Sequence, residues 1–191
     1  MNGPLIAAGT YYRVIPDWKQ LEMRRGYYAG VSLVDKQVGR ILDTLEETGL
    51  RNSTLVLLWG DHGYQLGEKG EWGKFTCFEL GARVPLMISL PPGIQHAPGS
   101  ISNALVELLD VFPTLVEAAN LPAPPQQLHG QSLLPLMEDP ARMAFKLNVS
   151  FSQYPRNGGL MGTSMRSRRN SLLHIYLSWR PRLYCTPILT L

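Results

Sequence analysis

The clearest pattern in the chain is a helical one over residues 17–49. Apolar residues recur there at intervals of three and four positions, which places them on one face of an α-helix. The members of this face are Tyr27, Val31, Val34, Val38, Ile41, Leu42 and Leu45. The charged residues fall mostly off the face, and we interpret them as a solvated side. We expect Asp17 to be the N-cap of this helix and Gly49 to be its C-cap.

Shorter apolar runs predict strands. The continuous run 55–59 is typical of a strand that is buried on both faces of a mainly parallel sheet. The runs 84–90 and 147–152 are predicted as further strands, and 111–119 is predicted as a helix. The proline-rich segment 121–128 is predicted as a loop. This order of helices and buried strands indicates an α/β fold.

Composition and charge narrow the class of protein. Of the 191 residues 45% are hydrophobic, which suits a packed globular domain. Residues 1–139 carry 10 Lys/Arg against 15 Asp/Glu, whereas residues 140–191 carry 8 Lys/Arg and no acid. A basic tail can indicate an anionic partner. This tail also loses the patterning of the preceding chain, so we do not expect nucleic acid binding.

The sequence predicts neither a membrane-spanning helix nor a signal peptide. No apolar run approaches the roughly 20 residues that a membrane-spanning helix requires. The first residues lack the basic start and long apolar stretch of a signal peptide. We therefore expect no membrane segment, and the compartment is not indicated.

An acid and an imidazole follow the predicted strand 55–59 directly, in Gly60-Asp61-His62-Gly63. Open α/β sheets bind ligands at the carboxyl ends of their strands. A carboxylate there can bind a hard divalent cation, and the histidine can be a ligand, a general acid or a hydrogen-bond donor. Alternatively, Asp61 caps a turn and His62 is merely hydrogen-bonded. The spacing alone leaves both interpretations open.

The next segment, 64–75, is predicted to be an irregular loop because three glycines alternate there with charged residues. Loops on a rigid scaffold commonly carry binding groups. A lysine such as Lys69 or Lys74 is a compact point charge that suits a tetrahedral oxyanion. Both lysines can equally be solvated loop charges.

An ordered set of motifs resembles the type I sulfatases, and most of all the iduronate-2-sulfatase type. The motifs are Gly60-Asp61-His62-Gly63, Gly70-Glu71-Trp72-Gly73-Lys74, Arg83-Val84-Pro85-Leu86, Asp110-Val111-Phe112-Pro113-Thr114-Leu115 and Ser152-Gln153-Tyr154-Pro155-Arg156. The resemblance runs from about Tyr11 to Arg166. It implies part of an alkaline-phosphatase-like α/β domain, with a mainly parallel sheet and a short C-terminal β segment.

The resemblance also implies an activity and a site. Residues 11–156 would be the carboxy-terminal part of a catalytic domain that hydrolyses sulfate esters, with a sulfated saccharide as substrate. Asp61 and His62 would help to bind one calcium ion, and Lys74 would contact the sulfate group. Residues 157–191 would be a residual C-terminal segment with an atypical basic tail.

The chain departs from the family pattern in two places. The nucleophile of the family is a formylglycine made from the cysteine of a Cys-x-Pro-Ser-Arg motif. Neither Cys77 nor Cys185 begins such a motif. The family also has an acidic pair near its N-terminus that completes the calcium site, and this pair is not present here. The calcium ligands are thus incomplete, and we expect the chain to be truncated and inactive alone. The second departure is the basic tail after Arg166. We consider two hypotheses for it: a shifted reading frame, or a basic arm that binds an anionic polymer.

Two other functions stay open at this point. A phosphoester hydrolase of the same superfamily would use Ser or Thr as nucleophile. A non-catalytic remnant or binding module would have no turnover at all.

Overall fold

The computed structural model describes residues 15–94, 96–142, 145, 149–156, 160–167 and 172–178. It divides into two compact units, each of which draws on two stretches of the chain. The first unit combines the chain up to Thr54 with Tyr64–Phe75. The second combines Leu55–Gly63 with the chain from Thr76 onward.

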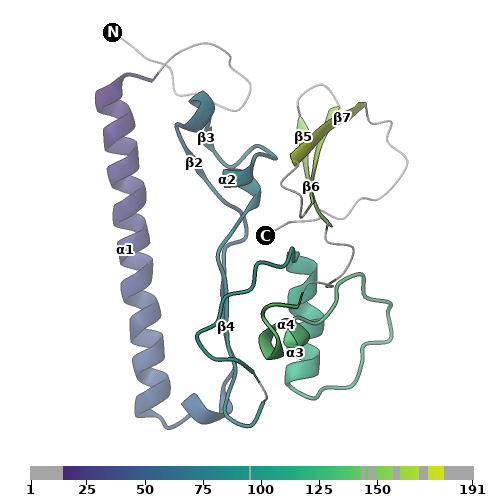
Figure 1. Ribbon diagram of the computed structural model, residues 1–191. Coiled ribbons are helices and arrows are strands. Elements are labelled where there is room, and N and C mark those ends of the chain that lie inside the picture. Colours follow the sequence, from purple (N-terminus) through teal and green to yellow (C-terminus); the bar gives the residue numbers. More distant parts are fainter. Residues whose placement is uncertain are drawn as a thin grey trace. The chain divides into compact units, whose positions relative to one another are not determined.

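The first unit contains the predicted long helix, α1 (Asp17–Glu47), which is labelled in Figure 1. The N-cap is Pro16 and not Asp17, so that prediction is wrong by one residue. The carbonyl oxygen of Pro16 already accepts from the N–H groups of Lys19 and Gln20, at 2.9 and 3.0 Å. Asp17 instead lies in the first turn, where its negative charge interacts favourably with the helix dipole.

The helix ends one residue earlier than the predicted C-cap, Gly49. Thr48 is the C-cap, and Gly49 follows it with φ +71°, a conformation that favours glycine. The N–H of Gly49 donates to the Glu46 carbonyl and that of Leu50 donates to the Leu45 carbonyl, both at 3.0 Å. These two bonds form a Schellman motif.

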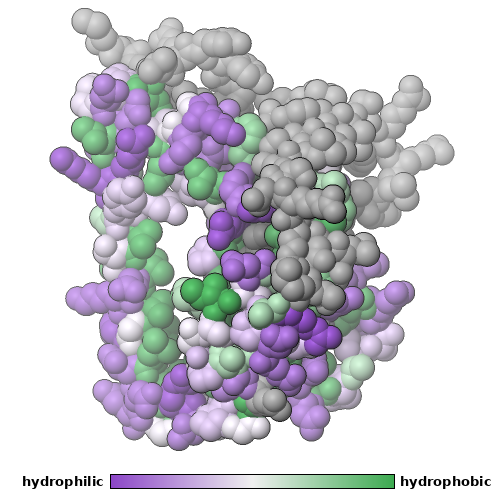
Figure 2. Space-filling model, in the orientation of Figure 1, coloured by the Kyte–Doolittle hydropathy of each residue, from purple (hydrophilic) through white to green (hydrophobic). Residues whose placement is uncertain are grey.

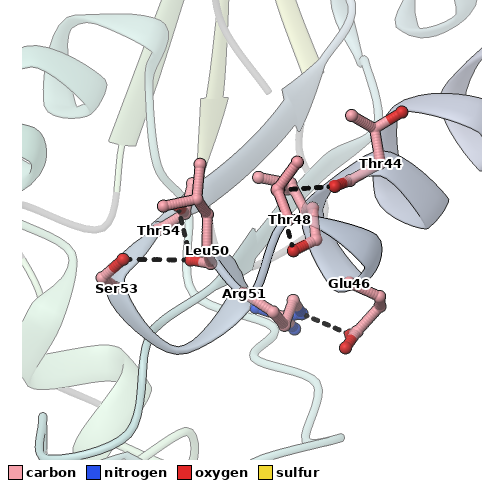
Figure 3. A network of polar contacts seen from close by, with 8 residues as sticks. Thr44, Glu46, Thr48, Leu50, Arg51, Ser53 and Thr54 are labelled. Atoms are coloured by element: carbon pink, nitrogen blue, oxygen red, sulfur yellow. Dashed lines mark hydrogen bonds and ion pairs between the residues drawn. The ribbon is translucent and has the colours of Figure 1, made fainter.

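A network of side-chain contacts continues past this helix end into η1 (Arg51–Ser53), and Figure 3 shows it. The hydroxyl groups of Ser53 and Thr54 both donate to the Leu50 carbonyl, at 3.1 and 2.8 Å. Arg51 forms an ion pair with Glu46 at 3.6 Å. The turn between α1 and the following strand is therefore held by local bonds.

Within the first unit, the helix α1 has no buried residue. Val31, Val34 and Ile41 are 53%, 59% and 64% exposed. Figure 2 shows hydrophobic residues in a row along this helix, at the left of the view, between hydrophilic ones. Among the described helices, none is long and apolar enough to cross a membrane.

The rest of the first unit is a short hairpin of β2 (Gln65–Leu66) and β3 (Trp72–Gly73), which pair antiparallel. The one-turn helix η2 (Glu68–Gly70) joins them. Gln65 is almost fully buried, at 1% exposure.

The second unit contains the predicted strands as β1 (Val56–Trp59) and β4 (Leu86–Ser89). They pair antiparallel, with Val56 opposite Ser89 and Trp59 opposite Leu86. Every strand pairing among the described residues is antiparallel, so this chain does not show the predicted parallel pairing. The apolar run located the strand but could not give the direction of its neighbour.

A small core packs against one face of this strand pair. The core consists of Leu133, Leu136 and Phe145, with Leu86 and Ile88 of β4 packed against it. The second unit also contains four short helices: α2 (Glu79–Ala82), η3 (Leu108–Asp110), α3 (Val111–Ala118) and α4 (Leu134–Glu138). The prediction of a helix at 111–119 is confirmed, and residues 121–128 form a loop as predicted.

Three further strands follow: β5 (Val149–Arg156), β6 (Leu160–Ser167) and β7 (Leu172–Ser178). They form an antiparallel sheet in the order β5-β6-β7. The predicted strand 147–152 corresponds to β5, although residues 147 and 148 lie outside the described residues. Its continuation through Pro155 was not foreseen. Proline is compatible with a strand at a sheet edge, which is where β5 lies among the described strands.

Candidate active site

The loop that carries Asp61 and His62 is fixed at both ends by backbone hydrogen bonds. At its start, the Gly60 N–H donates to the Pro85 carbonyl at 3.1 Å, just before β4. At its end, the Gly63 N–H donates to the Gly81 carbonyl of α2 at 2.9 Å. These bonds fix the loop to two segments that lie about 20 residues further along the sequence.

Gly63 is required here because no side chain fits. A Cβ atom on Gly63 would lie 2.0 Å from the carbonyl oxygen of Leu80 and 2.9 Å from that of Arg83. Both are backbone atoms that cannot move aside like the end of a flexible side chain. The glycine after His62 therefore allows the loop to pack against α2.

The two predicted ligands lie next to each other. The His62 N–H donates to Asp61 Oδ1 at 3.0 Å. His62 Nδ1 lies 2.9 Å from the Gly63 carbonyl oxygen. A carbonyl oxygen can only accept, so Nδ1 carries the hydrogen. In the neutral ring the lone pair is then on Nε2, which lies 3.6 Å from Asp61 Oδ2.

This arrangement brings a nitrogen lone pair and a carboxylate oxygen close together. Two such acceptors repel each other unless a proton or a cation lies with them. The Asp61 side chain is 79% exposed and that of His62 is 29% exposed. The pair can therefore reach a cation from solvent, and a carboxylate oxygen is the ligand type that calcium prefers.

The pair fits part of a calcium site but not a whole one. Calcium takes about six to eight oxygen ligands, and Asp61 and His62 offer far fewer. Among the described residues, no group of three or more His, Cys, Asp or Glu side chains is arranged to hold a metal ion. Further ligands must come from elsewhere if calcium binds here.

Lys74 belongs to the first unit, whereas Asp61 and His62 belong to the second. It follows β3 directly and is exposed. The hairpin before it is sharply folded, since Gly67, Lys69 and Gly73 have φ angles of +108°, +55° and +92°. Lys74 is therefore presented at the end of a closely turned hairpin.

Arg24 of α1 holds this hairpin, a role that the sequence did not indicate. Its Nε–H donates to the Leu66 carbonyl at 2.9 Å. Its guanidinium lies 5.6 Å from the centre of the Trp72 ring, a cation–π distance. A Cβ on Gly67 would lie 2.9 Å from both of these side chains. Arg24 and Leu66 are 42 residues apart, so no local pattern could have revealed the contact.

A second charged cluster lies in the same unit as Asp61, around Glu79 of α2. Glu79 accepts a short hydrogen bond from Arg166 of β6 and forms an ion pair with Arg83 at 3.6 Å. Arg83 and Arg166 also line a hollow of about 1210 Å³ beside β4. Neither Asp61 nor His62 lines this hollow.

Comparison with known proteins identifies the family. The model of the family described as "Sulfatase" matches residues 7–121. The chain belongs to the sulfatase family. A second family model, "N-sulphoglucosamine sulphohydrolase, C-terminal", matches residues 67–179 of this sulfatase chain. The family match therefore does not end near Arg166, as the sequence had suggested, but includes β7.

Individual sulfatases are also similar. Iduronate 2-sulfatase of Mus musculus is 36% identical over 137 residues, which cover 60% of this chain and 25% of the mouse protein. Iduronate 2-sulfatase of Homo sapiens is 35% identical over 184 residues, which cover 76% of this chain and 34% of the human protein. The chain thus spans a quarter to a third of the length of these relatives.

A solved structure confirms the fold. It is the structure of BT4656 in complex with its substrate D-Glucosamine-2-N, 6-O-disulfate, with a TM-score of 0.69 and 25% identity. The match covers 84% of this chain and 35% of BT4656. The predicted fold class, a partial α/β sulfatase domain, is confirmed.

Proposed function

We propose that this chain supplies part of the active site of a sulfate ester hydrolase, of the iduronate-2-sulfatase type, that acts on a sulfated saccharide. In this proposal Asp61 and His62 bind one calcium ion and Lys74 contacts the sulfate group. Two relatives support the substrate class, since one is an iduronate 2-sulfatase and the substrate of the other is a disulfated glucosamine.

The observation that carries the proposal is the geometry of Asp61 and His62 at the end of β1. Asp61 Oδ2 and His62 Nε2 lie 3.6 Å apart, and the side chains of Asp61 and His62 are 79% and 29% exposed. Bound calcium would stabilise negative charge on the sulfate oxygens. The Asp61 carboxylate would hold the ion, while the Gly63 carbonyl fixes the His62 ring with its acceptor nitrogen towards Asp61.

Lys74 would act on the sulfate group by its charge. A preorganised ammonium group stabilises negative charge that develops in the transition state. The family nucleophile motif, Cys-x-Pro-Ser-Arg, does not occur in this sequence. The nucleophilic step is therefore not assigned to any residue of this chain, and the chain alone is expected to have negligible turnover.

Calcium titration tests the metal half of the proposal. In the isotope-labelled chain, we expect calcium to cause saturable changes in the amide NMR shifts of residues 60–63, with a dissociation constant in the millimolar range or weaker because ligands are missing. Asp61→Asn should abolish these changes. Asp139→Asn removes another exposed carboxylate of the same unit and should leave them intact. Shifts at 60–63 that persist in Asp61→Asn would contradict the proposal.

A chimera tests the role of Lys74. It joins the amino-terminal part of human iduronate 2-sulfatase to residues 11–179 of this chain, and release of sulfate from a sulfated monosaccharide is measured. Lys74→Ala should lower kcat by about 100-fold or more, the usual effect of removing one donor to a developing oxyanion. Lys69→Asn is the control, because it removes a nearby charge and Asn tolerates the φ of +55°. Equal turnover by the Lys74→Ala and parent chimeras would exclude this role.

A further inference from the structure

The loop that carries Asp61 and His62 rests on the backbone of the short helix α2. The Gly63 N–H donates to the Gly81 carbonyl of this helix at 2.9 Å. A Cβ atom on Gly63 would lie 2.0 Å from the Leu80 carbonyl oxygen, so the two backbones are in direct contact. The position of the loop therefore depends on whatever holds α2 in place.

The helix α2 cannot hold itself in place. It is four residues long, and isolated helices shorter than about 12 residues are marginal in water because the first turn is costly to form. Its N-cap, Phe78, supplies no side-chain cap. The helix therefore needs a contact with another part of its unit.

Arg166 of β6 provides such a contact. Its Nη1 group donates to Glu79 Oε1 at the start of α2, and the two residues are 87 positions apart in the sequence. The Arg166 and Glu79 side chains are 29% and 38% exposed, so solvent screens their charges only in part. Hydrogen bonds between charged groups are also stronger than neutral ones. The contact thus ties the helix to a distant strand.

The strand that carries Arg166 is a firm anchor. It is the middle strand of the sheet β5-β6-β7. Arg166 itself lies opposite Ser150 of β5 and opposite Leu172 of β7. Its backbone is therefore held on both sides, whereas α2 is a single turn.

Arg83 also pairs with Glu79 but cannot anchor the helix. It is the C-cap of α2, its Nη1 lies 3.6 Å from Glu79 Oε1, and its side chain is 68% exposed. Because Arg83 moves together with α2, its ion pair does not connect the helix to any other element. The two arginines share one carboxylate and differ in what they link.

We propose that Arg166 is a positioning residue for the loop that carries Asp61 and His62. It acts through Glu79: the ion pair fixes α2 to β6, and α2 in turn holds Gly63. The consequence for calcium binding rests on the proposed function, whereas the hold on Gly63 does not.

Amide hydrogen exchange of the whole chain, followed by NMR in EDTA, tests this link. Exchange at the Gly63 N–H reports on opening of its bond to α2. Arg166→Met should speed it about five-fold or more, a magnitude that allows for solvent screening of this partly exposed pair. Arg166→Lys keeps the charge and a donor and should restore most of the protection. The Leu133 N–H, which donates to the buried Thr114 hydroxyl at 2.8 Å in the same unit, should exchange at an unchanged rate.

Two further variants show whether Arg166 acts through Glu79. Arg83→Met is the matched control, because it removes the other arginine from the same carboxylate, and it should leave exchange at Gly63 unchanged. Glu79→Gln should speed the exchange as Arg166→Met does. In the Glu79→Gln background, Arg166→Met should then add less than about two-fold, since the two changes remove the same interaction.

Calcium connects the link to the site. If α2 positions the calcium ligands, opening of the loop must release the ion, and calcium must slow the opening. At ten times its dissociation constant, calcium should slow exchange at Gly63 about ten-fold. A chain that binds no calcium would refute the proposed function, and the comparison in EDTA would then decide the link by itself.

Four results would overturn the proposal. The first is equal exchange at Gly63 in the parent chain and in Arg166→Met. The second is equal acceleration at Gly63 and Leu133, which would show a general loss of stability. The third is an effect of Arg83→Met as large as that of Arg166→Met, because the charge on Glu79 would then matter and the link to β6 would not. The fourth is calcium binding at residues 60–63 that leaves exchange at Gly63 unchanged.

Discussion

Replacement of Asp110 by alanine should destabilise the second unit strongly. Asp110 is fully buried and its carboxylate accepts two backbone hydrogen bonds, from the Glu107 N–H and the Gln131 N–H, each at 2.8 Å. Its own carbonyl accepts from the Thr114 hydroxyl at 2.5 Å, and that hydroxyl accepts from the Leu133 N–H at 2.8 Å. The network therefore joins η3 and α3 to the loop before α4.

The expected magnitude follows from the two N–H groups that lose their acceptor. Leaving one buried donor unsatisfied costs about 1–3 kcal/mol, so Asp110→Ala should lower the free energy of unfolding by about 2–6 kcal/mol. Asp110→Asn keeps one acceptor oxygen but turns an NH2 group towards the other donor. It should therefore cost about half as much, roughly 1–3 kcal/mol. Domains are stable by only about 5–15 kcal/mol in total, so both losses are large.

Urea unfolding followed by far-UV circular dichroism measures these losses. Glu117→Ala is the control, because Glu117 is an exposed carboxylate on α3 and its removal should change stability by about 0.5 kcal/mol or less. The reasoning is refuted if Asp110→Ala lies within about 1 kcal/mol of the parent, or if Asp110→Asn costs more than Asp110→Ala. Either result would mean that water or a rearranged loop satisfies the two donors.

Two further predictions concern glycine and arginine positions. Gly63→Ala should destabilise the chain by about 3 kcal/mol in the same urea assay, because its Cβ would meet the Leu80 carbonyl oxygen. Gly26→Ala, in open space on α1, should instead stabilise by about 0.5–1 kcal/mol; equal effects of the two would contradict the packing of Gly63. Arg24→Met should speed tryptic cleavage after Lys69 several-fold, since the hairpin loses its hydrogen bond and its cation–π contact. Arg25→Met, at the exposed neighbouring position, should not, and equal cleavage rates would show that Arg24 does not hold the hairpin.

The elements of the fold were predictable where a local rule applies. The helical period gave α1, and Gly49 gave its end, because a left-handed residue there is a property of the chain itself. The direction of β4 against β1 was not predictable, since antiparallel and parallel neighbours can both bury the same apolar run. The continuation of β5 through Pro155 was also missed, because proline is excluded from central strands but not from edges.

The candidate site shows the same division. Asp61 and His62 are adjacent in the sequence, so their proximity was foreseeable, but the orientation of the His62 ring depends on the Gly63 carbonyl. The Asp61 loop and the hairpin before Lys74 are each supported by a distant segment of their own unit. Gly63 packs on the Leu80 carbonyl and Arg24 binds the Leu66 carbonyl, and neither contact leaves a periodic signal.

The exposed apolar residues show that a pattern can predict a helix or strand correctly and still predict its burial wrongly. The run 55–59 indicated a strand buried on both faces, yet Leu58 and Trp59 are 37% and 47% exposed. The face that predicted α1 is exposed in the same way, although helices of globular proteins gain most of their stability from packing such a face. A sequence pattern reflects the packing of the whole domain in which it evolved. The pattern therefore predicts the helix and the strand, whereas the exposed fraction of each apolar residue depends on contacts that the pattern does not encode.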